Sequence, residues 1–206
     1  MKLYYAETIN SVKTCAVARY LPLEIEYAHV DLAKGEQYSP QYLAINPNGK
    51  APALVDGDLQ LWESNAIMCH LAMKAGSDLW PQGHDQVEIL RWFNWNSEHF
   101  SRYTGTIYFE NLIKPKLGFG EPDTAIVAEA SGFVQKYGAV LNEHLKSRDY
   151  LVADRLTLAD FAVATTLPFA TEARIPIEAF DAINRWYGRL MEIPAWREPF
   201  PARQVN

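Results

Sequence analysis

The hydrophobic pattern of this chain changes once along its length, near residue 80, and that change restricts the folds open to it. Before the change, short apolar runs typical of strands alternate with helical segments, whereas after it apolar residues recur only at helical spacing. Residues 75–85, between the two patterns, are rich in Gly, Ser, Asp, Pro and Gln, as surface linkers are. We therefore predict an α/β domain over residues 1–76, a linker over 77–86 and an all-helical domain over 87–206.

Local patterns predict the elements of the first domain. An apolar run at residues 3–6 and period-2 alternation at residues 23–27 indicate two strands, with a helix over residues 11–21 between them. Asp56-Gly57-Asp58 separates two further apolar runs, which is typical of a β-hairpin. Ser64 then stands where a helix N-cap would, ahead of apolar residues at helical spacing. The residues alone therefore predict β-α-β, a loop, and β-β-α.

Capping signals mark helices in the second domain. Pro122-Asp123 precedes a long amphipathic stretch that reaches Leu145. Thr157 and Asp160 have the spacing of a capping box, in which each side chain bonds to the backbone N–H of the other residue. The value of this motif is structural.

Charge and cysteine content argue against several classes of protein. The net charge is -6 with no cluster of five like charges, so we expect no nucleic-acid partner. Cys15 and Cys69 are far apart, which argues against a disulfide scaffold, a zinc ribbon or a dithiol centre and favours the reducing cytoplasm. The histidines lack metal-ligand spacing, and no long apolar run occurs. We expect a soluble protein without a metal site or a membrane span.

Four sequence blocks carry a resemblance to a known family. Asn46–Val55 followed by Trp62–Ile67 resembles the signature N-P-x-G-x-x-P-x-L-x-D…ESxAI, Asp31–Gln37 is similar to D-L-x-x-G-E-H, and Leu156–Asp160 to the S/T-x-A-D motif. With these blocks the chain resembles the cytosolic glutathione S-transferases over nearly its whole length. The resemblance implies an α/β thioredoxin-like domain of order β-α-β-α-β-β-α followed by an all-α helical bundle. It also implies a homodimer and glutathione as co-substrate.

The segment Thr8–Lys13 lies where the first helix begins, and a helix N-terminus stabilises an anion. Glutathione attacks as a thiolate, but a free thiol with a pKa of about 8.5 is only a few per cent ionised at neutral pH, so the protein must supply hydrogen-bond donors. The segment resembles the S/T-x-N-x-x-K/R pattern of serine-type and bacterial nu-like transferases. That resemblance implies Thr8 as the hydroxyl donor with Asn10 as a second donor. Ser11 is the alternative donor, or else the helix N-cap.

The resemblance also implies a binding site for glutathione. A cis bond between Ala51 and Pro52 would let the backbone of Ala51 pair with the cysteinyl backbone of the ligand. Glu63 would oppose the γ-glutamyl ammonium, and Ser64 with nearby N–H groups would bind the γ-glutamyl carboxylate. The candidates for the glycyl carboxylate are Lys34, Gln37 and Lys50. Gln37 replaces the histidine that is commoner in the family, so that end of the site is open to difference.

An electrophile pocket is expected beside the first helices of the second domain, where aromatic residues gather. The candidates are Trp95, His99, Phe100, Tyr103, Tyr108 and Phe109, although such a stripe is usually part of a core. The stretch Phe109–Gly118 is similar to one in bacterial members and indicates a bacterial origin.

Three functions stay open at this point. The first is conjugation of the glutathione thiolate to small hydrophobic electrophiles. The second is glutathione-dependent reduction of disulfides or peroxides, which the nu-like character of residues 8–13 favours. The third is a non-catalytic binding module, because a fold alone establishes no activity. The presence of Glu63, Ser64, Thr8 and Asn10 argues against the third.

Overall fold

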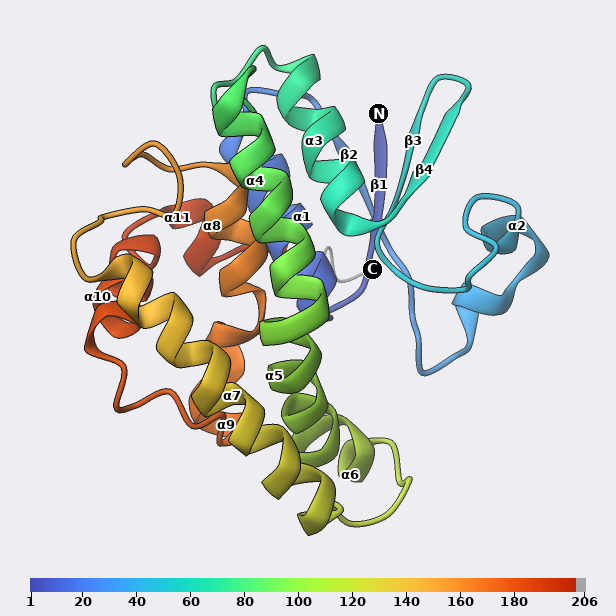
Figure 1. The fold of residues 1–206 in the computed structure, drawn as a ribbon. Coiled ribbons are helices and arrows are strands. Elements are labelled where there is room, and N and C mark those ends of the chain that lie inside the picture. Colours follow the sequence, from blue (N-terminus) through green and yellow to red (C-terminus); the bar gives the residue numbers. More distant parts are fainter. Residues whose placement is uncertain (203–206) are drawn as a thin grey trace. The chain divides into compact units, whose positions relative to one another are not determined.

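The computed structural model describes residues 1–202, which form two compact units (Figure 1). The first unit comprises Met1–Trp80 together with the chain from Glu192 onwards, and the second comprises Pro81–Met191. The division after Trp80 lies inside the predicted linker. The segment from Glu192 differs from the expectation, which assigned it to the helical domain. It belongs to the first unit because helix α11 (Pro194–Arg197), with Trp196 buried, packs against helix α1 (Ile9–Tyr20).

The first unit contains a four-stranded sheet with helices. Its elements are, in chain order, β1 (Lys2–Tyr5), α1 (Ile9–Tyr20), β2 (Glu26–His29), η1 (Glu36–Tyr38), α2 (Pro40–Leu43), β3 (Ala53–Asp56), β4 (Leu59–Trp62), α3 (Ser64–Lys74) and α11 (Pro194–Arg197). The strand order is β2-β1-β3-β4, with β1 and β2 parallel and the other pairs antiparallel. The β-α-β-α-β-β-α order is confirmed.

The core of the first unit lies where the central strands meet the helices. Leu3 of β1 is paired with Leu54 of β3, and neither side chain is exposed. α1 packs along α3, and buried side chains of both helices, including Val17 and Ile67, complete the apolar interior. The second strand begins at Glu26, later than its alternating pattern predicts, because only Glu26–His29 pair with β1.

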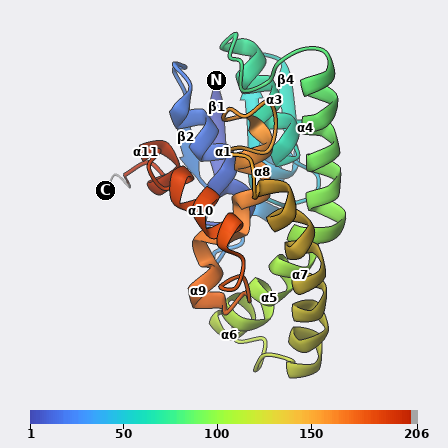
Figure 2. The same cartoon turned by 60° about the vertical axis from the view of Figure 1, so that its left-hand side comes forward.

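The regular elements of the second unit are all helices in the part of the chain that the structure describes. Its elements are α4 (His84–Trp95), η2 (Asn96–Phe100), α5 (Ser101–Tyr108), η3 (Phe109–Ile113), α6 (Lys114–Lys116), α7 (Thr124–Leu145), α8 (Leu158–Val163), η4 (Ala164–Phe169), α9 (Ala170–Ala173) and α10 (Asp181–Leu190). Two π-helical turns, η2 and η3, interrupt the helical run from α4 to α6. α5 packs along α7 (Figure 2). In residues 1–202, no helix combines the length and the apolar character that a membrane span requires.

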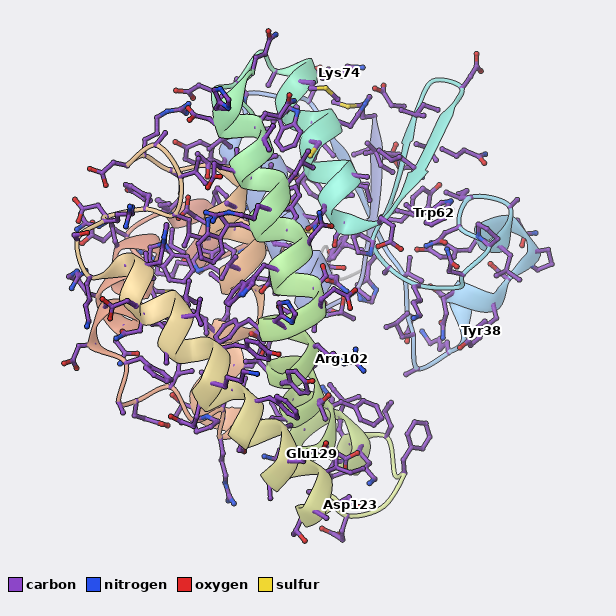
Figure 3. All side chains as sticks on the ribbon, viewed as in Figure 1. Tyr38, Trp62, Lys74, Arg102, Asp123 and Glu129 are labelled. Atoms are coloured by element: carbon purple, nitrogen blue, oxygen red, sulfur yellow. The ribbon has the colours of Figure 1, made fainter. Side chains whose placement is uncertain are left out.

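Both predicted caps of the second unit are confirmed. Asp123 stands at the start of α7 (Figure 3), where its carboxylate accepts from the N–H groups of Ala125 and Ile126. The capping box at the start of α8 places Asp160 in the core without exposed surface. Its carboxylate accepts from Thr157 N at 2.9 Å, from Leu151 N at 3.0 Å and from Trp186 Nε1 at 2.9 Å. One buried carboxylate therefore joins α8, α10 and the loop before α8.

Candidate functional site

The first unit contains a cavity of about 110 Å³ at the N-terminal ends of α1 and α3. The residues that line it are Asn10, Asn46, Asn48, Lys50, Ala51, Pro52, Glu63 and Ser64. The fold therefore brings together residues from three separate segments that the sequence analysis named for glutathione binding. Asn46 and Asn48 are additional lining residues, and their only sequence signal was their place in the N-P-x-G block.

The loop before β3 is held in shape by Asn46. Its Nδ2 donates to the carbonyl oxygen of Lys50 at 2.6 Å, while its Oδ1 accepts from the N–H of Asn48 at 3.1 Å. Tyr42 Oη donates to the same Lys50 carbonyl at 2.8 Å. The bond between Ala51 and Pro52 is cis, which confirms the expectation. These contacts fix Lys50, Ala51 and Pro52 at the wall of the cavity.

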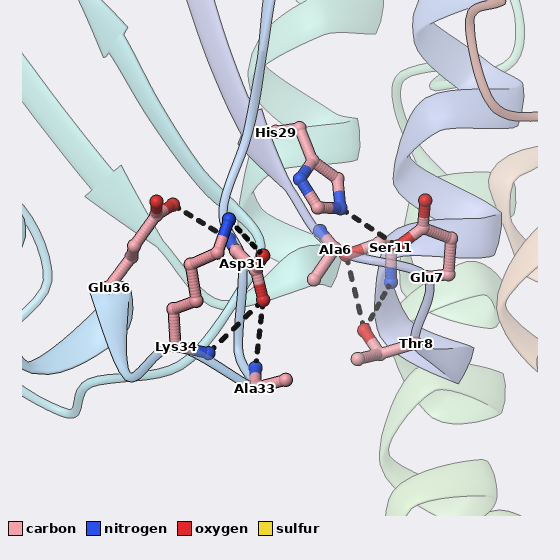
Figure 4. Close-up of polar contacts among 9 residues, drawn as sticks. All are labelled: Ala6, Glu7, Thr8, Ser11, His29, Asp31, Ala33, Lys34 and Glu36. Atoms are coloured by element: carbon pink, nitrogen blue, oxygen red, sulfur yellow. Dashed lines mark hydrogen bonds and ion pairs between the residues drawn. The ribbon is translucent and has the colours of Figure 1, made fainter. Parts of the chain in front are cut away.

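The start of α1 is capped by Thr8, not by Ser11. Thr8 has extended backbone angles, and its Oγ1 accepts from the N–H of Ser11 at 3.4 Å and donates to Ser11 Oγ at 3.2 Å (Figure 4). Ser11 is fully buried and lies inside the helix, whereas Thr8 keeps part of its surface exposed. Asn10 is exposed and lines the cavity. Of the three candidate donors, Ser11 is therefore the one enclosed by protein.

The start of α3 differs from the prediction by one residue. Ser64 is the first helical residue rather than the N-cap, and Glu63 occupies the cap position without a side-chain capping bond. Glu63 has a positive φ of 70°, a costly conformation for a residue other than glycine that is often found at functional sites. Because no side chain caps this end, its N–H groups are available to an anion. Ser64 Oγ donates to Asn10 Oδ1 at 3.4 Å and so links α3 to α1.

Lys13 is a residue near this site to which the sequence analysis gave no role. Its side chain is 4% exposed, and its Nζ donates to Asn65 Oδ1 at 2.8 Å. Burial lowers the pKa of this ammonium to about 8, and the carboxylate of Glu63 offsets part of that effect. The available signal was the lysine that ends the S/T-x-N-x-x-K/R pattern.

Two candidates for the glycyl carboxylate do not line the cavity. Lys34 forms an ion pair with Asp31 at 3.1 Å (Figure 4), which holds the pKa of Asp31 below its usual range and that of Lys34 above it. Gln37 is buried, and its Nε2 donates to the carbonyl oxygen of Leu32 at 3.5 Å. Lys50 is thus the cation that the described residues place at the cavity wall.

Several aromatic candidates of the second unit contact other rings, and some of these contacts are stacked. The ring of His99 stacks on Tyr137 with centroids 4.7 Å apart, and that of Tyr103 stacks on Phe133 at 4.3 Å. Trp95 stacks on Phe100, which is fully buried. Tyr108 is also buried, and its ring lies 4.9 Å from that of Phe169. Trp95, His99 and Tyr103 keep part of their surface exposed, and Phe109 is exposed, so these four rings can contact a ligand.

Metal ligands do not gather in the described part of the chain. Across residues 1–202, no three His, Cys, Asp or Glu side chains are placed to hold a metal ion together.

Two family models match this chain one after the other. Residues 1–73 match the family model "Glutathione S-transferase, N-terminal domain", and residues 99–194 match "Glutathione S-transferase, C-terminal domain". Glutathione S-transferase 3 of Zea mays is 35% identical over 94% of this chain and 89% of its own length. The disulfide-bond oxidoreductase YfcG of Escherichia coli is 28% identical over 94% of this chain and 91% of its own.

A solved structure is similar over the same length. Glutathione S-transferase I from maize, in complex with an atrazine glutathione conjugate, has a TM-score of 0.85 and 27% identity, and the match covers 96% of this chain and 95% of that one. The two family models together match most of the chain, in the order in which its two units occur. This chain belongs to the glutathione S-transferase family.

Proposed function

We propose that this protein is a glutathione S-transferase, an enzyme that joins the thiolate of glutathione to small hydrophobic electrophiles. The observation that carries the proposal is the charge pattern of the 110 Å³ cavity, whose wall contains Glu63 and the uncapped start of α3 as well as Lys50. Glutathione carries an ammonium and a carboxylate at one end and a carboxylate at the other. The cavity therefore offers a partner of the right sign to each charged end of the ligand.

Each lining residue has a role that its geometry allows. Glu63 would pair with the γ-glutamyl ammonium, and Ser64 with the first N–H groups of α3 would bind the neighbouring carboxylate. The backbone of Ala51, beside the cis bond to Pro52, would pair with the cysteinyl backbone. Lys50 would bind the glycyl carboxylate. Lys34 and Gln37 remain candidates for that end, but each would first have to leave its present partner.

Thr8 and Asn10 are the proposed activators of the thiol. The bond from Ser64 to Asn10 Oδ1 orients the amide of Asn10, which leaves its Nδ2 group to donate into the cavity. Thr8 Oγ1 can donate to a thiolate by rotation away from Ser11 Oγ. Donors of this kind stabilise the anion without adding a base that titrates, and the N-terminus of α1 adds to their effect.

Glutathione-dependent reduction of disulfides is the second candidate function. It is supported by the Thr8-x-Asn10 pattern and by the similarity to a relative named a disulfide-bond oxidoreductase. A non-catalytic role is less well supported, since the cavity retains Asn10, Glu63 and Ser64 together.

We propose further that the protein is a cytoplasmic homodimer with a role in detoxification. The two free cysteines, Cys15 and Cys69, are consistent with a reducing compartment. A bacterial origin stays a prediction, since the relatives include plant as well as bacterial proteins.

The deciding experiment is a glutathione titration followed by ultraviolet difference absorbance of the thiolate across pH. A thiolate band with a pKa well below that of free glutathione is expected. Assays with an activated aryl halide and with a small disulfide then separate conjugation from reduction. Binding without a thiolate band would contradict thiol activation, and a lack of binding would contradict the proposed function as a whole.

A further inference from the structure

We propose that Lys13 is a positioning residue of the glutathione site, whose buried ammonium holds the start of α3 in place and favours a bound γ-glutamyl carboxylate there. This inference rests on the proposed function, because it concerns how the same cavity recognises its ligand. Lys13 does not line the cavity, so it acts through its neighbours.

Two side-chain hydrogen bonds join α1 to the first two residues of α3. Asn10 Oδ1 accepts from Ser64 Oγ at 3.4 Å, and three residues later Lys13 Nζ donates to Asn65 Oδ1 at 2.8 Å. Residues three apart on a helix lie on the same face, so both bonds connect the same two helices. The part of α3 that would meet the γ-glutamyl carboxylate is therefore attached to α1 at two points.

Among the described residues, the ammonium of Lys13 forms no ion pair. Its hydrogen-bond acceptor is a neutral amide, and within residues 1–202 no carboxylate lies at ion-pair distance from it. A cation that is 4% exposed is costly when nothing of opposite charge lies beside it. An anionic ligand group at the start of α3 would supply that charge. Ligand binding would thus stabilise the Lys13 ammonium, whose charge the protein alone compensates poorly.

Among the described residues, Glu63 is the charged group that acts on Lys13. It stands on the α3 side and partly offsets the effect of burial, which lowers the pKa of the ammonium to about 8. α11, which also packs against α1, contributes Glu198 to a separate hollow that Arg19 lines near the other end of the helix. A ligand carboxylate that raises the pKa of Lys13 by one unit must bind about tenfold more tightly to the protonated form than to the neutral form.

S-methylglutathione is the probe for this idea, because its thioether does not titrate as a thiol does. Its affinity is measured by calorimetry between pH 6.5 and 9.5 for the wild type, Lys13→Met and Lys13→Arg. Lys116→Met removes a charge from an exposed site on α6 and serves as the control. Thermal unfolding of each protein is recorded over the same pH range.

The wild type and Lys116→Met should lose about tenfold in affinity as Lys13 deprotonates above pH 8, in addition to any loss from the ligand's own amine. Lys13→Met should bind about tenfold more weakly at pH 7 and lack that additional step. Lys13→Arg, which stays charged, should bind tightly at pH 7 and also lack the step. A purely structural lysine would not change the pH profile in this way.

Two results would overturn the inference. One is a Lys13→Met profile parallel to the wild type with less than about a twofold loss at pH 7. The second is a Lys13→Arg affinity profile with the same pH-dependent step as the wild type. This result decides the matter if Lys13→Met does not fold. A folded wild type that binds no S-methylglutathione at any pH would instead refute the proposed function, and this inference with it.

Discussion

Ser64 Oγ donates to Asn10 Oδ1 at 3.4 Å, across a separation of 54 residues in the sequence. The contact joins the first turns of α1 and α3, so that both helix N-termini border the same cavity. Backbone N–H groups at such ends favour anions. A ligand with a thiolate and a carboxylate at matching separation would therefore use both ends at once.

Thr8→Ala separates thiol activation from ligand binding. The variant should lose most of its turnover with little change in glutathione affinity, because Thr8 is proposed to stabilise only the thiolate. It should also lose about 1 kcal/mol of stability, since Thr8 caps α1. Ser39→Ala removes the equivalent cap of α2 and should lower stability without loss of turnover. Unchanged turnover in Thr8→Ala would point to Asn10 as the activator.

Glu63→Gln tests the charge at the γ-glutamyl end of the site. The substitution keeps the size of the side chain but removes the counter-ion of the ligand's ammonium. Glutathione affinity should fall by about tenfold, which corresponds to ~1.4 kcal/mol. Calorimetry at neutral pH measures the change, and Glu24→Gln, at an exposed position before β2, is the matched control. Equal losses in both variants would mean that only the net charge matters.

The two cysteines should be dispensable for either enzymatic reaction. Burial raises the pKa of both Cys15 and Cys69 to about 12, so neither forms an appreciable thiolate at neutral pH. A variant with Cys15→Ala and Cys69→Ala should keep its conjugation and disulfide-reduction rates. A thiol reagent should label the native wild type slowly and the unfolded protein fast. Loss of disulfide reduction alone would imply that a protein thiol takes part.

Asp160→Ala should be among the most destabilising single substitutions in the second unit. It leaves the buried N–H groups of Leu151, Thr157 and Trp186 without their acceptor. The cost should be at least ~3 kcal/mol, because each unsatisfied buried donor costs about 1–3 kcal/mol. Urea unfolding measures this loss of stability. Asp58→Asn is the control, because it changes an exposed residue in a hairpin turn that favours asparagine. A similar midpoint for both variants would contradict this role for the carboxylate.

His144 should make stability fall in mild acid. Burial lowers its pKa in the folded state, and its Nε2 lies 2.8 Å from the carbonyl oxygen of Leu151. The contribution of neutral His144 to the free energy of unfolding is complete above the unfolded pKa of about 6.5. It decreases as pH falls from there towards the lower folded pKa, because the unfolded chain takes up the proton first.

The buried Asp160 has the opposite slope, because burial raises its folded pKa to about 6. Stability therefore falls as pH rises from the unfolded pKa of about 3.9 to about 6, since the unfolded chain releases the proton first. Urea unfolding of the wild type and of His144→Gln at pH 5.5 and 7.5 separates the two effects, because Asp160 is common to both proteins. The variant should show a smaller loss of stability in acid than the wild type. Equal losses would assign the acid sensitivity to other groups.

Features that depend on near neighbours in the chain could be predicted well. The β-α-β and β-β-α segments of the first unit, the cap at Asp123 and the box at Asp160 follow from short patterns, because turns and caps are bonds between residues a few positions apart. The exact residue at which an element begins was predicted less well. Ser64 and Glu63 are neighbours, and only the backbone angle imposed by the fold decides which of them ends the loop.

The sequence by itself determined which chemical groups stand near the site: Thr8, Asn10, Lys50, Glu63 and Ser64 all carry their signal in local motifs. Only the tertiary structure decided what surrounds them. It buried Lys13 against Asn65, enclosed Ser11, and kept Lys34 and Gln37 away from the cavity wall. The physical reason is that burial and electrostatic environment depend on contacts between distant segments, whereas a lysine or a serine in the sequence has the same local pattern whether it ends up exposed or enclosed.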